Sequence, residues 1–350
     1  MRTMQSDYMH WAKFKKSVPY QLTGSEVPHV RMDSLDWTIA DLGTDGASHP
    51  RYSPLRKRIA ARYGVEVEQV VAADGTSMAN FLAMAALISP GDEVLIEHPT
   101  YDPILGVASF LGAKIRRFER NPADAFRLDP AIVQAAMSDR TKLIVLTNLH
   151  NPSGSLATED ELRAIGQLGA RVLIDEVYLD ASGQRSAVHI GPEFVVTNSL
   201  TKVYGLSGLR CGWILAQPEL AERMWRLNDL FGVNQAHQAE RLGCIAFDHI
   251  DQVIGDAPAM LERNRQLFND FLSTRDDLAC APAVHGVTAF PRWSGDTQRL
   301  DDHLRVSYDC AVVPGRWFEL PDHFRIGFGI PSHIFAEALT RLGHGLDDLK

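Results

Sequence analysis

The sequence predicts an α/β protein: a mostly parallel seven-stranded sheet with helices on both faces, followed by a smaller α+β domain. From about residue 54 to residue 217, apolar strand-like runs alternate with helical patterns, which is the arrangement of a doubly wound domain. The runs at 142–146 and 172–174 are continuously apolar, which favours strands buried on both faces, as in a parallel sheet. After residue 217 a long amphipathic helix and short strands indicate the second domain.

Seven strands are expected in the first part of the chain. They cover Gln69–Ala73, Glu93–Glu97, Lys114–Phe118, Lys142–Asn148, Arg171–Glu176, Phe194–Ser199 and Arg210–Ala216. Helices are expected between them near 55–63, 76–88, 103–111, 130–137 and 158–168. The last helix opens with a capping box, Thr158-Glu159-Asp160-Glu161, and Gly169 ends it.

The composition and periodicity of the sequence divide the chain into three parts. Residues 1–40 are polar and irregular, and we expect an N-terminal arm with one short helix near 7–15 that belongs to the small domain. Residues 41–245 form the large domain, and residues 246–350 form the small C-terminal domain. In the latter we expect a long helix around Met260–Leu272, a last helix at 333–347, and short strands near 286–292, 311–313 and 324–327.

Composition excludes several classes of protein. The chain has 350 residues and a formal net charge of −9, so it lacks the electrostatic footprint of a nucleic-acid-binding protein. The longest apolar stretch, Phe81–Ile88, is far shorter than the roughly 20 residues of a membrane span. The N-terminus has no apolar signal-peptide core. We therefore expect a cytoplasmic protein. The sequence contains no C-x-x-C motif, so no metal site is predicted, and the four cysteines, Cys211, Cys244, Cys280 and Cys310, are expected to be scattered reduced thiols.

Three polar clusters follow strands of the predicted sheet. Lys202 lies in a turn rich in glycine and serine after strand 194–199, and a lysine in an apolar setting is costly to keep charged. A neutral amine is what Schiff-base chemistry with a carbonyl cofactor requires. The segments Asn148–Gly154 and Asp175–Tyr178 follow two other strands. Ligands of open α/β sheets bind outside the carboxyl ends of the strands, so we expect the three clusters to meet in one crevice.

The combination of motifs resembles the fold-type I pyridoxal-phosphate enzymes, in the class I/II aminotransferase branch. The motifs are Asn-Pro-Ser-Gly at 151–154, Asp-x-x-Tyr at 175–178, and Ser-x-x-Lys at 199–202 with an arginine eight residues later. The resemblance covers roughly residues 40–350. It implies pyridoxal phosphate as cofactor, held by the large domain, an α-amino acid and a 2-keto acid as substrates, and a homodimer with active sites at its interface.

The resemblance also assigns catalytic roles. Lys202 is similar to the lysine that forms the internal aldimine and then moves a proton between the substrate Cα and the cofactor. Asp175 is similar to the carboxylate that pairs with the pyridine nitrogen and keeps it protonated. Asn151 and Tyr178 resemble the partners of the ring's phenolic oxygen. Arg325 matches the arginine that binds the substrate α-carboxylate, for which a planar guanidinium is better suited than a lysine.

The cofactor's phosphate needs an anion site. Gly75, Thr76 and Ser77 join a strand to a helix, where a glycine permits close approach and the first amides of the helix are free. Ser199 and Arg210 match the family's remaining phosphate ligands, and Arg210 supplies a formal charge that amides lack.

Other contacts of the family have a less complete match in this sequence. Tyr101 matches the aromatic residue that stacks on the cofactor ring. The family usually places a tyrosine of the partner subunit near the phosphate, and here Tyr52, His49 or Arg51 is the candidate, or the contact is absent. The candidates for the pocket of the substrate side chain are Trp11, Tyr20, Asn228, Asp229, Phe231 and Asn234.

Other functions were weighed against transamination. Ser-Leu-Thr-Lys at 199–202 also fits the S-x-x-K of serine β-lactamases, but the S-D-N and K-T-G motifs of that class do not occur. A non-enzymatic cofactor-binding regulator is disfavoured because Lys202, Asp175 and Arg325 are all present. A lyase, catalysing β-elimination or C–S cleavage, and a decarboxylase stay open as alternatives on the same scaffold. The identity of the amino acid and of the keto acid also stays open.

Overall fold

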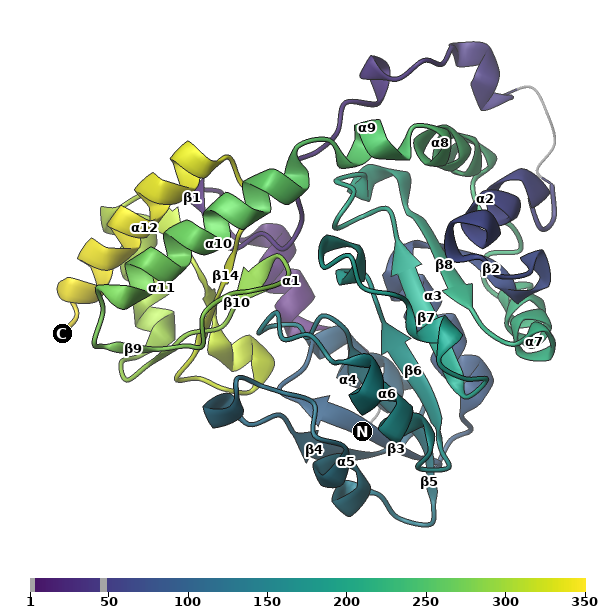
Figure 1. Ribbon diagram of the computed structural model, residues 1–350, viewed down its shortest axis with the longest axis horizontal. Coiled ribbons are helices and arrows are strands. Elements are labelled where there is room, and N and C mark those ends of the chain that lie inside the picture. Colours follow the sequence, from purple (N-terminus) through teal and green to yellow (C-terminus); the bar gives the residue numbers. More distant parts are fainter. Residues whose placement is uncertain (1–3, 45–48) are drawn as a thin grey trace.

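The computed structural model describes residues 4–44 and 49–350, and within them a seven-stranded sheet forms the centre of the larger lobe (Figure 1). All its strands run parallel except β8, which is antiparallel to both of its neighbours. The predicted fold class is confirmed. In spatial order the strands are β2 (Val70–Asp74), β8 (Cys211–Leu215), β7 (Phe194–Ser199), β6 (Arg171–Asp175), β5 (Thr141–Thr147), β3 (Glu93–His98) and β4 (Lys114–Glu119).

Helices cover both faces of this sheet because alternate strand residues point to opposite sides. On β6, Val172 and Ile174 pack into one core and Leu173 packs into the other. The first core includes residues of α2 (Ser53–Tyr63), α5 (Pro130–Ala136), α6 (Glu159–Gly166) and α8 (His237–Asp248). The second includes residues of α3 (Gly75–Leu87), α4 (Asp102–Phe110) and α7 (Pro218–Asn228).

The predicted capping box is present at the start of α6. Thr158 Oγ1 accepts a hydrogen bond from the Glu161 amide over 3.2 Å, and the Thr158 amide donates to Glu161 Oε2 over 2.9 Å. The box satisfies two amides that have no partner inside the helix. Helix α6 therefore begins one residue after Thr158.

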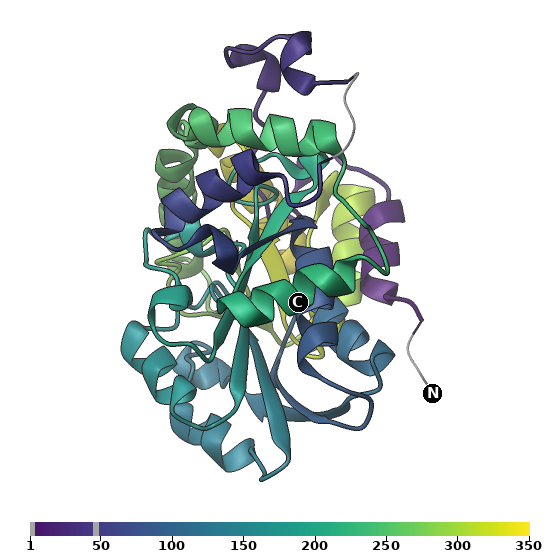
Figure 2. The same ribbon diagram turned by 90° about the vertical axis from the view of Figure 1, so that its right-hand side faces the viewer.

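The smaller lobe has its own core and includes the N-terminal arm (Figure 1). Strand β1 (Tyr20–Gln21) pairs in parallel with β12 (Cys310–Ala311), and Leu22 is buried in the core of this lobe. Helix α1 (Asp7–Phe14) lies beside the yellow-green segments of the small lobe in Figure 2. The other elements of the lobe are α10 (Ala257–Ser273), α11 (Thr297–Ser307), α12 (Ser332–Asp347), β9 (Leu278–Ala279), β10 (Thr288–Ala289), β11 (Arg292–Trp293), β13 (Val313–Pro314) and β14 (Phe324–Gly327).

Two expected strands of the small lobe are each divided in the structure. The expected strand 286–292 gives β10, which pairs with β14, and β11, which pairs with β9, with Pro291 between them. Proline cannot donate to a strand ladder, so it breaks the run. The expected strand 311–313 divides at Val312, whose amide donates to Asp301 Oδ1 over 3.1 Å instead of to a strand. The chain thereby changes from the β1 pairing to the β14 pairing.

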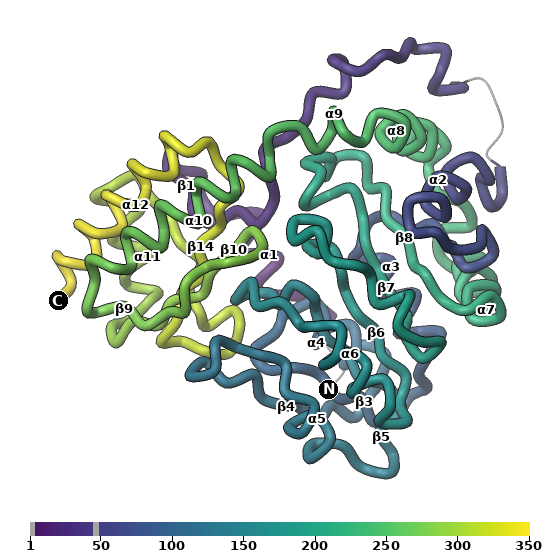
Figure 3. The backbone as a smooth tube through the Cα atoms, viewed as in Figure 1, coloured from purple at the N-terminus to yellow at the C-terminus, as the bar shows by residue number. Residues whose placement is uncertain are grey.

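The connection between the lobes runs through α8, α9 (Ile250–Ile254) and α10 (Figure 3). Phe247 and Val253 pack against the sheet of the large lobe, whereas Met260 belongs to the core of the small lobe. Gly255, with φ of +46°, lies between them. We therefore propose that the large domain extends to about Gly255, beyond the boundary at 245 that the sequence suggested. Across the residues described, no helix combines the length and the apolar character needed to cross a bilayer.

Candidate active site

A cavity of about 830 Å³ lies at the carboxyl ends of the parallel strands, where the N-terminal arm and the small lobe meet the sheet. It brings together most of the residues that the sequence assigned to the cofactor, to catalysis and to the substrate carboxylate. Those that line it are Thr76, Ser77, Tyr101, Asn151, Asp175, Tyr178, Lys202, Arg210 and Arg325. Gly75 and Ser199 do not line it but contact residues that do. A second cavity, of about 900 Å³, lies near Pro122 and Pro282 and contains none of these residues.

Lys202 faces the arm across the cavity. Its Nζ donates to Ser25 Oγ over 3.3 Å and lies 3.9 Å from Glu26 Oε2. About a third of the side chain (31%) is reached through the cavity, yet desolvation by the walls lowers the pKa of the amine, and Glu26 opposes that shift. A lowered pKa makes an amine better able to lose and regain a proton near neutral pH.

Asp175 is buried at the end of β6, beneath the cavity. Its Oδ2 accepts from Asn80 Nδ2 over 2.8 Å, and its Oδ1 accepts from the Val177 amide over 3.1 Å. Burial raises the pKa of this carboxyl to about 6, against the effect of both hydrogen bonds and of Lys202. A cationic partner would stabilise the ionised form of such a group.

Asn80 was missed by the sequence analysis. Thr197 Oγ1 donates to Asn80 Oδ1 over 2.6 Å, which leaves Asn80 Nδ2 to donate to Asp175. Its spacing from Thr76 could have identified it. Asn80 lies four residues after Thr76 in an apolar helix, so both side chains share one face.

The turn from β2 into α3 is the place where the sequence predicts an anion site. Gly75 has φ of +78°, and a Cβ at this position would overlap the guanidinium of Arg210. Arg210 Nη2 donates to the Asp74 carbonyl over 3.1 Å, so its charge is held at the N-terminus of α3. Thr76 Oγ1 donates to Ser199 Oγ over 2.7 Å. The first amides of a helix have no partner within it, and here they adjoin an arginine and hydroxyls, which are donors suited to phosphate.

Arg325, in β14, is buried and has no carboxylate partner in the described part of the chain. Its Nη1 donates to Asn151 Oδ1 over 3.0 Å, and its Nη2 donates to the hydroxyl of Tyr8 and to the Thr23 carbonyl over 3.2 and 3.1 Å. Its Nε is buried without a hydrogen-bond partner. A buried guanidinium that lacks a counter-ion is costly, and an anionic ligand in the cavity would offset that cost.

Asn151 and Tyr178 lie between these groups. Because Asn151 Oδ1 accepts from Arg325, its Nδ2 is the atom left to donate to a ligand in the cavity. Tyr178 is buried, and burial raises the pKa of its hydroxyl, so the group remains a donor. A side-chain hydrogen bond with Ser25 lowers that pKa in part.

The ring of Tyr101 stands edge-on to that of Tyr8, with centroids 5.8 Å apart at 83°. Its hydroxyl donates to Met9 Sδ over 3.1 Å, so helix α1 fixes the ring at the cavity wall. Tyr8, Thr23, Ser25 and Glu26 were missed by the sequence analysis. The pairing of β1 with β12 brings the N-terminal arm to the site, and no local sequence pattern predicts that pairing.

The remaining candidates do not line this cavity. Tyr52 is buried against His237, with ring centroids 4.9 Å apart, and His49 stacks beside it. Arg51 covers the ring of Trp225 at 3.8 Å. Neither these three nor the six side-pocket candidates, all of which the structure describes, line the cavity. Their proposed contacts stay predictions.

Comparison with known proteins shows the family of the chain. The sequence matches the family described as "Aminotransferase class I and II" over residues 8–342. The chain belongs to this family. It is a pyridoxal-phosphate-dependent transferase, as the sequence predicted.

Relatives within the family carry different names. A capreomycidine synthase from Streptomyces vinaceus is 32% identical over 310 residues, covering 83% of this chain and 78% of that protein. A histidinol-phosphate aminotransferase from Halorubrum lacusprofundi is 28% identical over 343 residues, covering 94% of this chain and 89% of that protein.

Solved structures show the same fold. A PLP-dependent aminotransferase from Streptococcus suis superposes with a TM-score of 0.89 at 22% identity, covering 100% of this chain and 99% of that one. A PLP-dependent cyclase named OrfR superposes with a TM-score of 0.85 at 23% identity, covering 99% of each chain.

The residues of the cavity fit the cofactor of the aminotransferase class I and II family. Because Gly75 has no Cβ, the guanidinium of Arg210 can lie against this turn, where it adds a cation for a phosphate. Asp175 is a buried acceptor for a protonated ring nitrogen, Asn151 and Tyr178 offer donors for a phenolic oxygen, and Lys202 offers the amine.

Proposed function

We propose that the protein is an aminotransferase that moves an amino group between an α-amino acid and a 2-keto acid. The observation that carries this proposal is Arg325, a buried arginine with no carboxylate partner in the described residues, on the wall of the cavity that holds Lys202. A planar guanidinium binds a carboxylate through two parallel hydrogen bonds. Both substrates of such a reaction carry that group next to the reacting carbon.

The residues of the chain then divide the work. When bound, pyridoxal phosphate supplies an electron sink for the substrate's Cα carbanion. Asp175 would hold the ring nitrogen in its protonated form, and Asn151 and Tyr178 would hold the phenolic oxygen. Lys202, whose pKa is lowered by burial, would take the proton from Cα and return it. Arg325 would orient the α-carboxylate, and Tyr101 would cover the ring.

The alternative is a lyase, of the β-elimination or C–S type, or a decarboxylase on the same scaffold. Similarity to proteins named as a synthase and a cyclase supports this alternative. These reactions use the same lysine and the same sink and differ in which bond at or next to Cα breaks. The orientation of the substrate selects that bond.

A product analysis separates the two. The holoenzyme is incubated with a panel of amino acids and a 2-keto acid acceptor, and both products are identified by mass spectrometry. An aminotransferase yields the keto acid that retains the donor's side chain, together with the amino acid of the acceptor. Ammonia or CO₂ released without a new amino acid would overturn transamination. Lys202→Ala is the control and should yield no product.

We also propose that the protein works as a homodimer in the cytoplasm. Leu230, Phe231 and Val233, next to α7, are exposed apolar residues that a subunit interface would cover. A closed two-fold dimer is the commonest oligomer of soluble proteins. In such a dimer one of Tyr52, His49 and Arg51 would contact the cofactor phosphate in the cavity of the other subunit, if that contact exists.

A further inference from the structure

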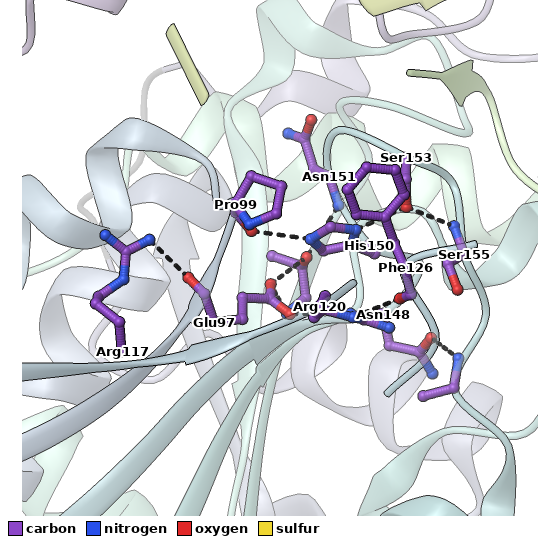
Figure 4. Close-up of polar contacts among 12 residues, drawn as sticks. Glu97, Pro99, Arg117, Arg120, Phe126, Asn148, His150, Asn151, Ser153 and Ser155 are labelled. Atoms are coloured by element: carbon purple, nitrogen blue, oxygen red, sulfur yellow. Dashed lines mark hydrogen bonds and ion pairs between the residues drawn. The ribbon is translucent and has the colours of Figure 1, made fainter. Parts of the chain in front are cut away.

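A buried ion pair lies behind the cavity wall, at the carboxyl ends of β3 and β4 (Figure 4). Arg120 Nη1 donates to Glu97 Oε2 over 2.9 Å, and neither side chain has any exposed surface. Neither residue lines the cavity. Taking two charges out of water costs several kcal/mol per ion, so such a pair persists only where further hydrogen bonds complete it.

Those further bonds lead toward the cavity. Glu97 Oε1 accepts from both the amide and the hydroxyl of Thr147, each over 2.7 Å. Thr147 is the last residue of β5 and stands opposite Asp175 on β6. Its Oγ1 also lies 3.0 Å from the amide of Asn151. The contacts therefore run from the ion pair through one hydroxyl to a residue of the site.

The charge of Glu97 sets the direction of these hydrogen bonds. An ionised carboxylate only accepts, so the Thr147 hydroxyl must donate to it. The lone pairs of that hydroxyl are then left for the Asn151 amide. Three donors and the positive charge of Arg120 favour the ionised carboxylate against the effect of burial, which raises its pKa. Arg120 is held in turn by donation from its Nε to the Phe126 carbonyl over 2.8 Å.

We propose that Glu97, Arg120 and Thr147 are positioning residues that hold Asn151, and through it Arg325, in the geometry that binds the substrate α-carboxylate. The last link is the 3.0 Å hydrogen bond from Arg325 Nη1 to Asn151 Oδ1. The inference rests on the proposed role of Arg325 and adds the device that fixes it. It assigns a function to a buried ion pair that touches neither substrate nor cofactor.

The loop that carries Asn151 has anchors besides Thr147 (Figure 4). His150 Nε2 lies 2.9 Å from the Pro99 carbonyl, and its Nδ1 lies 2.7 Å from Ser153 Oγ. Asn148 Oδ1 accepts from the Ala157 amide over 3.0 Å. Removal of the Thr147 hydroxyl should therefore leave the loop folded while it frees the Asn151 amide. An acid-to-amide change at Glu97 would risk the fold, so Thr147 is the better site for a test.

The test compares Thr147→Val, which keeps the shape of the side chain but removes the hydroxyl, with Thr147→Ser, which retains it. For each holoenzyme we would measure the dissociation constant of an unreactive α-methyl amino acid and of the amine that lacks its carboxylate. The pH titration of the bound cofactor's visible absorption reports separately on Asn151 at the phenolic oxygen. Thermal unfolding reports on the fold.

In Thr147→Val the α-methyl amino acid should bind about three- to tenfold more weakly, the loss of roughly one hydrogen bond, and the absorption titration should shift. The amine should change by less than about twofold, and Thr147→Ser should match the wild type in both measurements. Equal weakening of the two ligands, or unchanged binding with lowered thermal stability alone, would overturn the proposal. Binding needs no turnover, so a finding that the enzyme is a lyase would refute the proposed function and leave this test valid.

Discussion

Arg325 of the small lobe donates from Nη1 to Oδ1 of Asn151, a residue of the loop after β5 in the large lobe, over 3.0 Å. This hydrogen bond joins the two lobes at the cavity. It occupies the side-chain oxygen of Asn151 and leaves Nδ2 for a ligand in the cavity. A change at either residue therefore alters the other, and mutational effects at these two positions should not be additive.

Arg325→Ala should discriminate between substrates by their carboxylate. A charge-assisted contact contributes roughly 1.5–3 kcal/mol, so kcat/KM for α-amino acids should fall about 10- to 150-fold. Amines without the carboxylate should be poor substrates of the wild type and nearly indifferent to the change. The measurement compares an amino acid with its decarboxylated analogue on both proteins. Equal losses for the two would mean that Arg325 supports the fold instead.

Lys202 should carry the cofactor covalently. The purified holoenzyme should be yellow, and borohydride should abolish the visible band while it fixes the cofactor on this lysine. Lys202→Ala should retain the cofactor without the covalent link and show no turnover. Peptide mapping identifies the modified residue, and an adduct on a different lysine would refute the assignment.

Asp175→Ala should leave the cofactor bound and the enzyme nearly inactive. Loss of a buried charge aimed at the reacting system typically costs about 10²- to 10³-fold in rate. Single-turnover rates with an amino acid are the measurement. Asn80→Ala removes only one hydrogen bond to Asp175 and serves as the matched control, with a smaller expected loss. An Asp175 variant within a few-fold of wild type would exclude the proposed role.

Glu176 should make the stability of the protein depend on pH. Burial raises the pKa of its carboxyl from 4.5 to about 8, although the Ala187 amide donates to Oε1 over 2.7 Å. The unfolded chain then loses this proton at a lower pH than the folded one. The stability present below about pH 4.5 is therefore lost progressively as pH rises to about 8.

Glu176→Gln removes that ionisation. It should raise the free energy of unfolding at pH 8.5 by about 1–3 kcal/mol and flatten its dependence on pH, with little effect near pH 5. Urea unfolding at several pH values is the measurement. A variant with the same slope as the wild type would show that Glu176 ionises in the fold as it does in water.

The proposed dimer should be visible by sedimentation at micromolar concentration. Phe231→Asp places a charge among the exposed apolar residues beside α7 and should shift the protein toward monomer, with the fold retained. Val306→Asp, at a similarly exposed apolar residue on α11, is the control and should leave the oligomer unchanged. A wild-type holoenzyme that sediments as a monomer would contradict the dimer.

The central sheet could be predicted closely because its signals are local. Apolar strand-like runs placed every strand of this sheet within one residue of its observed ends, and the polar residues after three of them marked the cavity. Helices α7 and α8 were not predicted, although Pro218 at the start of α7 and the spacing of Ala221 and Met224 are local signals of an amphipathic helix.

Other parts could not be predicted from local patterns. Strands of two residues, such as β1 and β9, are too short to show a period and exist through pairing with β12 and β11. Ser25 and Glu26 lie in an irregular segment, and only the tertiary pairing of the arm brings them within reach of Lys202. The burial of Glu97 with Arg120 likewise depends on the neighbouring positions of β3 and β4.

The pairing of β1 with β12 has a consequence for the synthesis of the protein. Tyr20 and Gln21 are made long before their partners, Cys310 and Ala311. At about 5–20 residues per second, the arm waits roughly 15–60 s before its strand can form. Leu22 and Tyr8, both buried in the finished protein, are without their final neighbours throughout that interval. The nascent chain can complete its central sheet before then, but it cannot complete the cavity until Cys310 and Ala311 have been made.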